Sequence, residues 1–408
     1  MTAPGDGIFA GVKILELGAG AAGPVATRYF ADQGATVIRV ESSKRPDFLR
    51  MYHLTKDTPH DLDAAPMFVL MNPNKQSIAI NMSLPEGVAL AKRLVGWADV
   101  VSENFSPKAM AKWGLDYESL RADHDGLIMV SSCLFGQTGP QRMYPGFGGQ
   151  GSALAGFNHL TGWEDRDAVG PFGTITDSLS PRYVALLITA ALLRRDRTGE
   201  GQYLDVSQIE TAVYSLSEMI VRCSANGEVV GRRGNSSDDA APHGIYPCRG
   251  DDRWIAIAVM SDAEWRLLAT EIGDPELADA SRFGGLAQRL AQRDEIDRRL
   301  AAWTQAFDAH ELMARLQAVG IEAGAVLTLD DLLADPQLAA RGHFEVLRHD
   351  RLGELQFEHC GIRTAAAPAA QLLTPGPNLG EHTNAILRDQ LGMDDDEIAS
   401  LAERGVLV

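Results

Sequence analysis

Short, continuously apolar segments alternate with amphipathic segments throughout the first half of this 408-residue chain. VKILEL (12–17) and TVIRVE (36–41) are rich in β-branched residues, as expected of parallel strands buried on both faces. Residues 21–34 between them have helical periodicity. The alternation continues with strands expected at 77–82, 99–105 and 127–136 and helices at 84–98 and 117–126. This order predicts an α/β fold with a doubly wound parallel sheet and right-handed crossovers.

The second half of the chain has a different pattern. An apolar helix is expected at 182–195, followed by a strand and another long helix, and 225–243 has the composition of a loop or linker. Two strands joined by a turn are expected at 244–259, and helical patterns run on to about residue 318. Because one core rarely serves a chain this long, a smaller α+β domain is predicted here. The tail is expected to form two short helices, the last capped by the acidic run 394–397.

The charge and the cysteines narrow the classes of ligand. A formal net charge of −18 argues against binding to nucleic acid or an anionic membrane, which both require a basic surface. An anionic small molecule would need a local basic pocket. No apolar run reaches the ~18 residues of a membrane span, and no signal-peptide pattern begins the chain. The cysteines at 133, 223, 248 and 360 lack paired or metal-ligand spacing, so we expect free thiols in a reducing cytoplasm and no metal.

Gly18, Gly20 and Gly23 form a G-x-G-x-x-G pattern between the first expected strand and helix. Glu41 ends the next strand about 20 residues later, as in dinucleotide-binding proteins. An NAD-dependent dehydrogenase is therefore one hypothesis. The other interpretation is that these glycines only allow a tight turn. The rest of the chain offers no obvious pair of residues for hydride transfer, which counts against the dehydrogenase.

Asp177 lies in the segment VGPFGTITDSLSPRY (169–183), just before the apolar helix expected at 182–195. A carboxylate beside an apolar element is unexpected, because burial disfavours its charge. One interpretation is structural, since an aspartate a few residues before a helix is a common N-cap. The other is that this carboxylate has a chemical role. The residues around it leave both interpretations open.

Seven segments, taken in order, resemble the family III CoA-transferases, a group that includes the α-methylacyl-CoA racemases. They are GVKILELGAGAAGPVATRYFADQGATVIRVE, NPNKQSIAINM, DVVSENFSPKAMAKWGLDYESL, SCLFGQTGP, LTGWEDRDAVGPFGTITD, RRDRTGEGQYLDVS and PNLGEHT. The resemblance implies a Rossmann-like CoA-binding domain (1–215), a linker and small α+β domain (216–345) and a C-terminal segment (346–408) that returns to the first domain. It also implies a ring-shaped subunit that interlocks with a second copy as a dimer.

The same resemblance places the family's nucleophilic aspartate at Asp177. An ionised carboxylate can attack a thioester without a general base. The implied sequence passes through an aspartyl anhydride and an aspartyl-CoA thioester, with CoA thioesters as co-substrates and no tightly bound cofactor. Apolar surroundings would protect these intermediates from water.

The resemblance also implies which residues contact CoA. They are Ala21, Ala22, Lys44, Arg45, Met71, Asn72, Lys75, Asn104, Phe105 and Lys112. Lys44 or Arg45 would supply the local basic pocket that phosphate groups require. In the family a glycine-rich loop provides further donors, but the equivalent residues here, 238–244, lack the glycine run. The roles of this loop and of His243 are therefore left open.

The residue at position 147 distinguishes between a transferase and a racemase. Racemases add a proton-carrying histidine about thirty residues before the aspartate, where this chain has Phe147 after Gly146. His159 fits that pattern poorly. The resemblance therefore favours a transferase, with a racemase as the alternative. Within the family, residues 146–163 and 170–182 resemble the members that use succinyl-CoA and aromatic-substituted succinates or other dicarboxylic acids. We expect a homodimer, with pairing to a related subunit left open.

Overall fold

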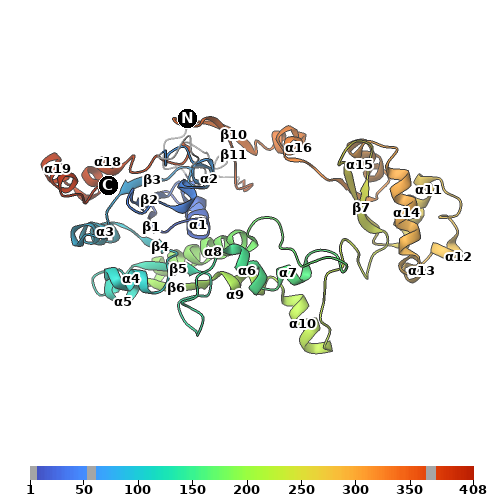
Figure 1. Ribbon diagram of the computed structural model, residues 1–408, viewed down its shortest axis with the longest axis horizontal. Helices are drawn as coiled ribbons and strands as arrows, with labels where there is room; N and C mark the ends of the chain where they lie inside the picture. Colours follow the sequence, from blue (N-terminus) through green and yellow to red (C-terminus); the bar gives the residue numbers. More distant parts are fainter. Residues whose placement is uncertain (1–6, 53–60, 364–373) are drawn as a thin grey trace. The chain divides into compact units, whose positions relative to one another are not determined.

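The computed structural model describes residues 7–52, 61–363 and 374–408. These residues form two compact units (Figure 1). The first comprises the described residues of Met1–Asn158, Gly170–Val229 and Ala339–Val408, and the second comprises His159–Val169 and Val230–Leu338. Each unit has its own hydrophobic core.

A six-stranded parallel sheet forms the centre of the first unit. Its strands are β1 (Lys13–Leu17), β2 (Thr36–Glu41), β3 (Gln76–Ala79), β4 (Val100–Glu103), β5 (Ile128–Cys133) and β6 (Gln202–Ser207). Their order is β3-β2-β1-β4-β5-β6, and every neighbouring pair is parallel. The direction of winding therefore reverses between β1 and β4, which is where open α/β sheets bind their ligands. The predicted fold class is confirmed.

Helices cover both faces of this sheet, which explains why its strands are apolar on both sides. On one face, α1 (Ala22–Ala31) and α8 (Ile175–Thr198) pack on residues such as Ile14 and Val130. The opposite face is covered by α3 (Pro85–Trp97), α4 (Lys108–Trp113), α5 (Tyr117–Arg121), α18 (Thr383–Leu391) and α19 (Asp395–Glu403). The C-terminal segment therefore returns to the sheet with which the chain began.

Smaller elements complete the chain. They are the 3-10 helix Phe48–Arg50, α2 (Pro66–Met71), α6 (Gly148–Leu154), α7 (Phe157–Leu160), α9 (Gln208–Tyr214), α10 (Ser217–Asn226), α16 (Leu329–Ala334), α17 (Pro336–Ala340) and the antiparallel pair β10 (Phe344–His349) and β11 (Gly353–Glu358). The single long helix expected after residue 207 is wrong, because Ser215 and Leu216 separate α9 from α10. The expected acidic cap is confirmed, since the Asp394 side chain accepts from the backbone N–H of Glu397.

The second unit packs helices on a three-stranded antiparallel sheet. The sheet contains β7 (His243–Pro247), β8 (Trp254–Ala258) and β9 (Glu322–Ala325), in that order. The helices are α11 (Asp262–Ile272), α12 (Ala280–Phe283), α13 (Leu286–Ala291), α14 (Arg293–Thr304) and α15 (Ala309–Ala318). Trp265 and Leu312 lie in the core between sheet and helices. This is the α+β arrangement predicted from 244 onward.

Across both units, no described helix is long and apolar enough to cross a membrane.

Candidate active site

Asp177 lies in the first turn of α8. The helix begins at Ile175, with Thr174 as the N-cap residue, and the Asp177 N–H donates to the Thr174 carbonyl oxygen at 2.8 Å. The helix therefore begins seven residues earlier than predicted, and Asp177 is not its N-cap. A carboxylate in the first turn is favoured by the helix dipole. The side chain is half-buried, so its charge remains accessible to a ligand.

Two other elements hold the Asp177 carboxylate. The Gln208 side chain, at the start of α9, donates from Nε2 to Oδ1 at 2.7 Å. Oδ2 faces Gly148 at the start of α6, where a Cβ atom would lie 2.3 Å from it. The Thr176 hydroxyl donates to the Gly148 carbonyl oxygen at 3.1 Å and ties α6 to α8. The carboxylate is thus fixed at Oδ1 and packed closely at Oδ2.

An aromatic contact joins this site to the glycine turn after β1. Phe147 precedes Gly148, is 64% exposed, and lies edge-to-face against Phe48 with ring centroids 6.0 Å apart. The Phe48 ring covers Gly20, where a Cβ atom would lie 2.6 Å from the ring. The turn at 18–23 and Asp177 therefore border the same region of the first unit. A phenyl ring cannot carry a proton, which leaves the racemase alternative without its second base at this position.

The glycines of this turn make room for the protein's own side chains. Asn104 accepts from the Ala19 N–H at 2.9 Å and donates to its carbonyl oxygen at 2.7 Å, and a Cβ at Gly18 would lie 2.3 Å from Asn104 Oδ1. The Gly20 N–H donates to the Asp47 carboxylate at 2.9 and 3.1 Å. An anion thus already occupies the amide that a pyrophosphate would require.

Glu41 is also unavailable as a ribose ligand. Arg50 donates to both of its carboxylate oxygens at 2.9 Å, and Ser77 donates to Oε2 at 2.7 Å. Burial opposes the charge of Glu41, but Arg50 and Arg39 hold its pKa below the usual value. Together with the Gly20–Asp47 contact, this arrangement disfavours the dehydrogenase hypothesis.

Asn72 and Lys75, two of the residues expected at CoA, belong to a buried polar network. Lys75 is 2% exposed and donates from Nζ to Glu16 at 2.8 Å, Asn72 Oδ1 at 2.9 Å and the Pro24 carbonyl oxygen at 2.7 Å. Burial lowers the pKa of Lys75 to about 8 against the opposing charge of Glu16. Arg39 also contacts Glu16. The network braces the strands beneath the glycine turn, and in this conformation both side chains are already paired.

Most of the other residues expected at CoA lie closer to solvent. Lys44, Arg45 and Lys112 are exposed and form no ion pair with another described residue. Ala21 is the N-cap residue of α1, beside buried Ala22. Met71 ends α2, and Phe105, between β4 and α4, packs edge-to-face on Trp113 next to Lys112. Asn104, as described above, holds the turn itself.

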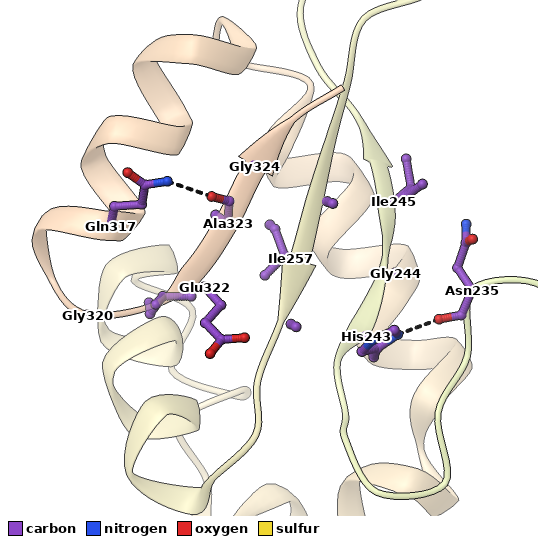
Figure 2. Close-up of a pocket in the computed structure, with 13 residues that line it drawn as sticks. Asn235, His243, Gly244, Ile245, Ile257, Gln317, Gly320, Glu322, Ala323 and Gly324 are labelled. Atoms are coloured by element: carbon purple, nitrogen blue, oxygen red, sulfur yellow. Dashed lines mark hydrogen bonds between the residues drawn. The ribbon is translucent and has the colours of Figure 1, made fainter. Parts of the chain in front are cut away.

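A separate cavity of about 690 Å³ lies in the second unit (Figure 2). Its lining includes Ala256, Ile257 and Glu322 on the sheet formed by β7, β8 and β9. His243 borders the cavity, with Nδ1 2.6 Å from the Asn235 carbonyl oxygen. This contact does not test the roles of residues 238–244 and of His243, which stay open. In the described residues, no group of three or more His, Cys, Asp or Glu side chains is placed to hold a metal ion.

Sequence reasoning missed Gln208, Asp47 and the role of Gly148. The glycine-rich run GFGGQGS (146–152) was a signal for close backbone approach, since both Gly148 and Gly151 leave no space for a side chain. Gln208 gave no such signal, because its contact with Asp177 joins residues 31 apart in the chain.

Comparison with known proteins gives a consistent result. The family model described as CoA-transferase family III matches residues 9–383. Succinyl-CoA–D-citramalate CoA-transferase of Chloroflexus aurantiacus is 36% identical over 97% of both chains. Succinate–glutarate CoA-transferase of Agrobacterium fabrum is 32% identical over 93% of this chain and 95% of its own. A CAIB/BAIF family protein from Brucella suis superposes with a TM-score of 0.85 and 31% identity, covering 94% of this chain and 100% of that structure.

Proposed function

The chain belongs to CoA-transferase family III, and we propose that it moves CoA from succinyl-CoA to a small dicarboxylic acid through covalent intermediates on Asp177. As a member of this family it is an enzyme that uses CoA thioesters as co-substrates. The donor, the acceptor and the covalent route are the proposed parts.

The observation that carries the mechanism is the setting of Asp177. Its carboxylate is half-buried, held at Oδ1 by an uncharged donor and packed at Oδ2 against a glycine. No base is needed, because an ionised carboxylate is already a nucleophile. A carboxylate fixed in place can attack a bound thioester with little loss of entropy.

Four displacements complete one transfer. An Asp177 oxygen attacks the donor acyl carbon, which forms a mixed anhydride and releases the CoA thiolate. The thiolate attacks Cγ of Asp177 and expels the donor acid, which takes the attacking oxygen with it. The acceptor carboxylate then attacks Cγ of the aspartyl-CoA thioester and releases the thiolate. Finally the thiolate attacks the acceptor acyl carbon, and Asp177 regains a carboxylate whose second oxygen comes from the acceptor. No net proton or electron is transferred.

The choice of substrates rests on the names of related proteins. Relatives at 28–36% identity are named for succinyl-CoA or succinate together with citramalate, malate or glutarate. We propose that the acceptor is a dicarboxylic acid of this size. Lys44, Arg45 and Lys112 are the exposed cations that we assign to the CoA phosphates, against the formal net charge of −18.

The substrate experiment measures CoA transfer from succinyl-CoA to a panel of acids. We expect turnover with at least one of glutarate, L-malate and D-citramalate, and a raised melting temperature with succinyl-CoA. NADH is the matched control and should leave the melting temperature unchanged. Binding of micromolar NADH, or transfer to monocarboxylic acids alone, would contradict the proposal.

The racemase alternative is tested by proton exchange. Incubation with a 2-methylacyl-CoA in D₂O should give no deuterium at the α-carbon, because Phe147 cannot act as a base. Deuterium incorporation at a rate comparable to that of CoA transfer would show that a second base exists and that the enzyme is a racemase.

We also propose that the active form is a homodimer. Chloroflexus aurantiacus has related proteins named as alpha and beta subunits of succinyl-CoA–L-malate CoA-transferase, so the family includes subunit pairs. The support in this chain is a set of exposed apolar side chains on α8 and on α10: Leu186, Leu193 and Val221 are 60–64% exposed, and α10 has no buried residue. Leu186 and Leu193 lie seven residues apart on one face of α8, and exposed apolar side chains that share a face can form an interface.

A further inference from the structure

We propose that Gln208 is a catalytic hydrogen-bond donor, which stabilises the negative charge that forms on Oδ1 of Asp177 when Cγ is attacked. This inference rests on the proposed function, in which Asp177 carries the acyl group and then CoA. It assigns a role to a residue outside the set that the sequence predicted.

The position of Gln208 is fixed by the end of β6. Ser207 is the N-cap residue of α9: its hydroxyl accepts from the Glu210 N–H at 3.2 Å and donates to the Leu134 carbonyl oxygen at 3.2 Å. Gln208 follows directly and is 6% exposed. Its amide group is therefore held by the fold and is not free to turn into solvent. Nε2 lies 2.7 Å from Oδ1 of Asp177, a short hydrogen bond with good donor–acceptor distance.

The two Asp177 oxygens differ in their surroundings. Oδ1 accepts from Gln208, whereas Oδ2 has no hydrogen-bond partner among the described residues and faces the bare backbone of Gly148. Oδ2 therefore keeps its lone pairs for attack on the donor acyl carbon. After this step Oδ1 is the carbonyl oxygen of the anhydride, and later of the thioester, with Gln208 still beside it.

The second and third displacements place their charge on Oδ1. When the CoA thiolate attacks Cγ, a C–S bond forms and the carbonyl electrons move to Oδ1 before the bond to the donor carboxylate breaks. The acceptor carboxylate repeats this at the thioester, and the C–S bond breaks. A carbonyl oxygen that gains a full charge strengthens its bond to a fixed donor, so the interaction favours the transition state over the acyl-enzyme.

An amide suits this position better than a charged or acidic group. It donates without giving up its proton, so it cannot neutralise the Asp177 carboxylate before the first displacement. It also adds no charge that would repel the anionic acceptor. The first and fourth displacements occur at the substrate's acyl carbon, so Gln208 should affect them much less.

The test separates these steps in the Gln208→Met variant, which keeps the side-chain length but has no N–H donor. The enzyme is mixed with succinyl-CoA alone, and quenched samples are assayed for free CoA thiol and, by intact mass, for the CoA adduct. We expect adduct formation to slow by about 10²-fold, the typical effect of losing one such donor. The rate of thiol release, which reports the first displacement, should change by less than about threefold. The anhydride should then persist until water slowly cleaves it, because the second displacement is slow. The control is Gln390→Met, which should match the wild type. Gln390 is a glutamine of α18 that accepts a hydrogen bond from Trp97.

A second variant provides a pH signature. Gln208→Glu keeps the shape but places a carboxylate against Asp177, and mutual repulsion raises the pH at which the pair binds a proton. Adduct formation by this variant should therefore recover as the pH falls from 8 to 6, because the introduced carboxyl group donates a hydrogen bond again once it is protonated. The wild-type rate should not rise in this range.

Three results would overturn the inference. The first is that Gln208→Met forms the adduct at a rate within about twofold of wild type. The second is that folded Gln208→Met loses thiol release and adduct formation equally. The third is that adduct formation by Gln208→Glu does not recover as the pH falls. Failure of the proposed function is distinguished by Asp177→Asn. If that variant still formed the adduct, the nucleophile would lie elsewhere, whereas an inactive Asp177→Asn with a normal Gln208→Met would refute the role of Gln208 alone.

Discussion

The packing of Gly148 against Asp177 predicts an effect of a single methyl group. In Gly148→Ala the new Cβ would lie 2.3 Å from Asp177 Oδ2 and 2.4 Å from Thr174 Cβ, so either the carboxylate or α6 must move. We expect kcat to fall by at least about tenfold, since misplacement of a reacting group by about 1 Å can cost far more. Steady-state kinetics with succinyl-CoA measures this effect.

Gly149 provides the matched control. A Cβ atom at Gly149 meets no other atom within 4 Å, so Gly149→Ala should leave kcat close to the wild-type value. If the two alanine variants had the same activity, close packing at residue 148 would not control the position of the carboxylate.

The buried ions under the glycine turn predict a large effect on stability. Arg39 is fully buried and contacts Glu16, Glu41 and Asp47, so Arg39→Met leaves three buried carboxylates without this partner. The expected loss in free energy of unfolding is about 3–5 kcal/mol, measured by chemical denaturation. Arg194→Met removes an exposed ion pair with Glu200 and should cost about 1 kcal/mol or less. Equal losses in the two variants would contradict this account.

The C-terminal end of β4 predicts a pH dependence of stability. Burial raises the pKa of Glu103 to about 7, and its Oε2 accepts from the Phe105 N–H at 2.8 Å. A raised carboxyl pKa means that the folded protein binds the proton more tightly than the unfolded chain. This contribution to stability is present below about pH 4.5 and is lost as the pH rises through about 7, by about 3 kcal/mol in total.

Glu103→Gln should remove this dependence and keep an acceptor for the Phe105 N–H. The difference in free energy of unfolding between variant and wild type should therefore shift in favour of the variant from pH 5 to pH 8. A constant difference over this range would show that Glu103 does not titrate as its burial implies.

The elements that local sequence determines were predictable. The strands of the parallel sheet have continuous apolar runs because both faces are covered, and Asp394 and Glu397 cap α19 by local hydrogen bonds. The start of α8 was not predictable in this way. Ile175 and Thr176 are β-branched, and Pro181 lacks the N–H that would bond to the Asp177 carbonyl oxygen, yet the helix includes all three. Packing of α8 on α1 and the sheet outweighs these preferences.

The candidate site depends on contacts between distant segments. The family resemblance led to Asp177, but no periodicity connects it with Gln208 or Gly148, because the fold brings these residues together from α8, α9 and α6. The same limit applied to Asn72 and Lys75. The family resemblance implied that they contact CoA, whereas in the structure Lys75 donates to Glu16 and to Asn72.

The apolar surface of the first unit predicts the oligomeric state. Leu186 and Leu193 lie two turns apart on one face of α8 and are 64% and 61% exposed. If a second copy covers them, the wild type should have the mass of a dimer in light scattering, and Leu186→Glu should shift the molecule toward the monomer. Leu267→Glu, at an exposed leucine of the second unit, should leave the mass unchanged. A monomeric wild type would refute the proposed dimer.

The central claim is that Asp177 carries the acyl group, and oxygen labelling tests it most directly. The four displacements leave one acceptor oxygen in the Asp177 carboxylate after each turnover. Wild-type enzyme mixed with succinyl-CoA and succinate labelled with ¹⁸O in its carboxylates should therefore gain ¹⁸O in the peptide that contains Asp177, and Asp177→Asn should be folded but inactive and unlabelled. Turnover without label in that peptide, label at another residue, or substantial activity of Asp177→Asn would contradict the mechanism.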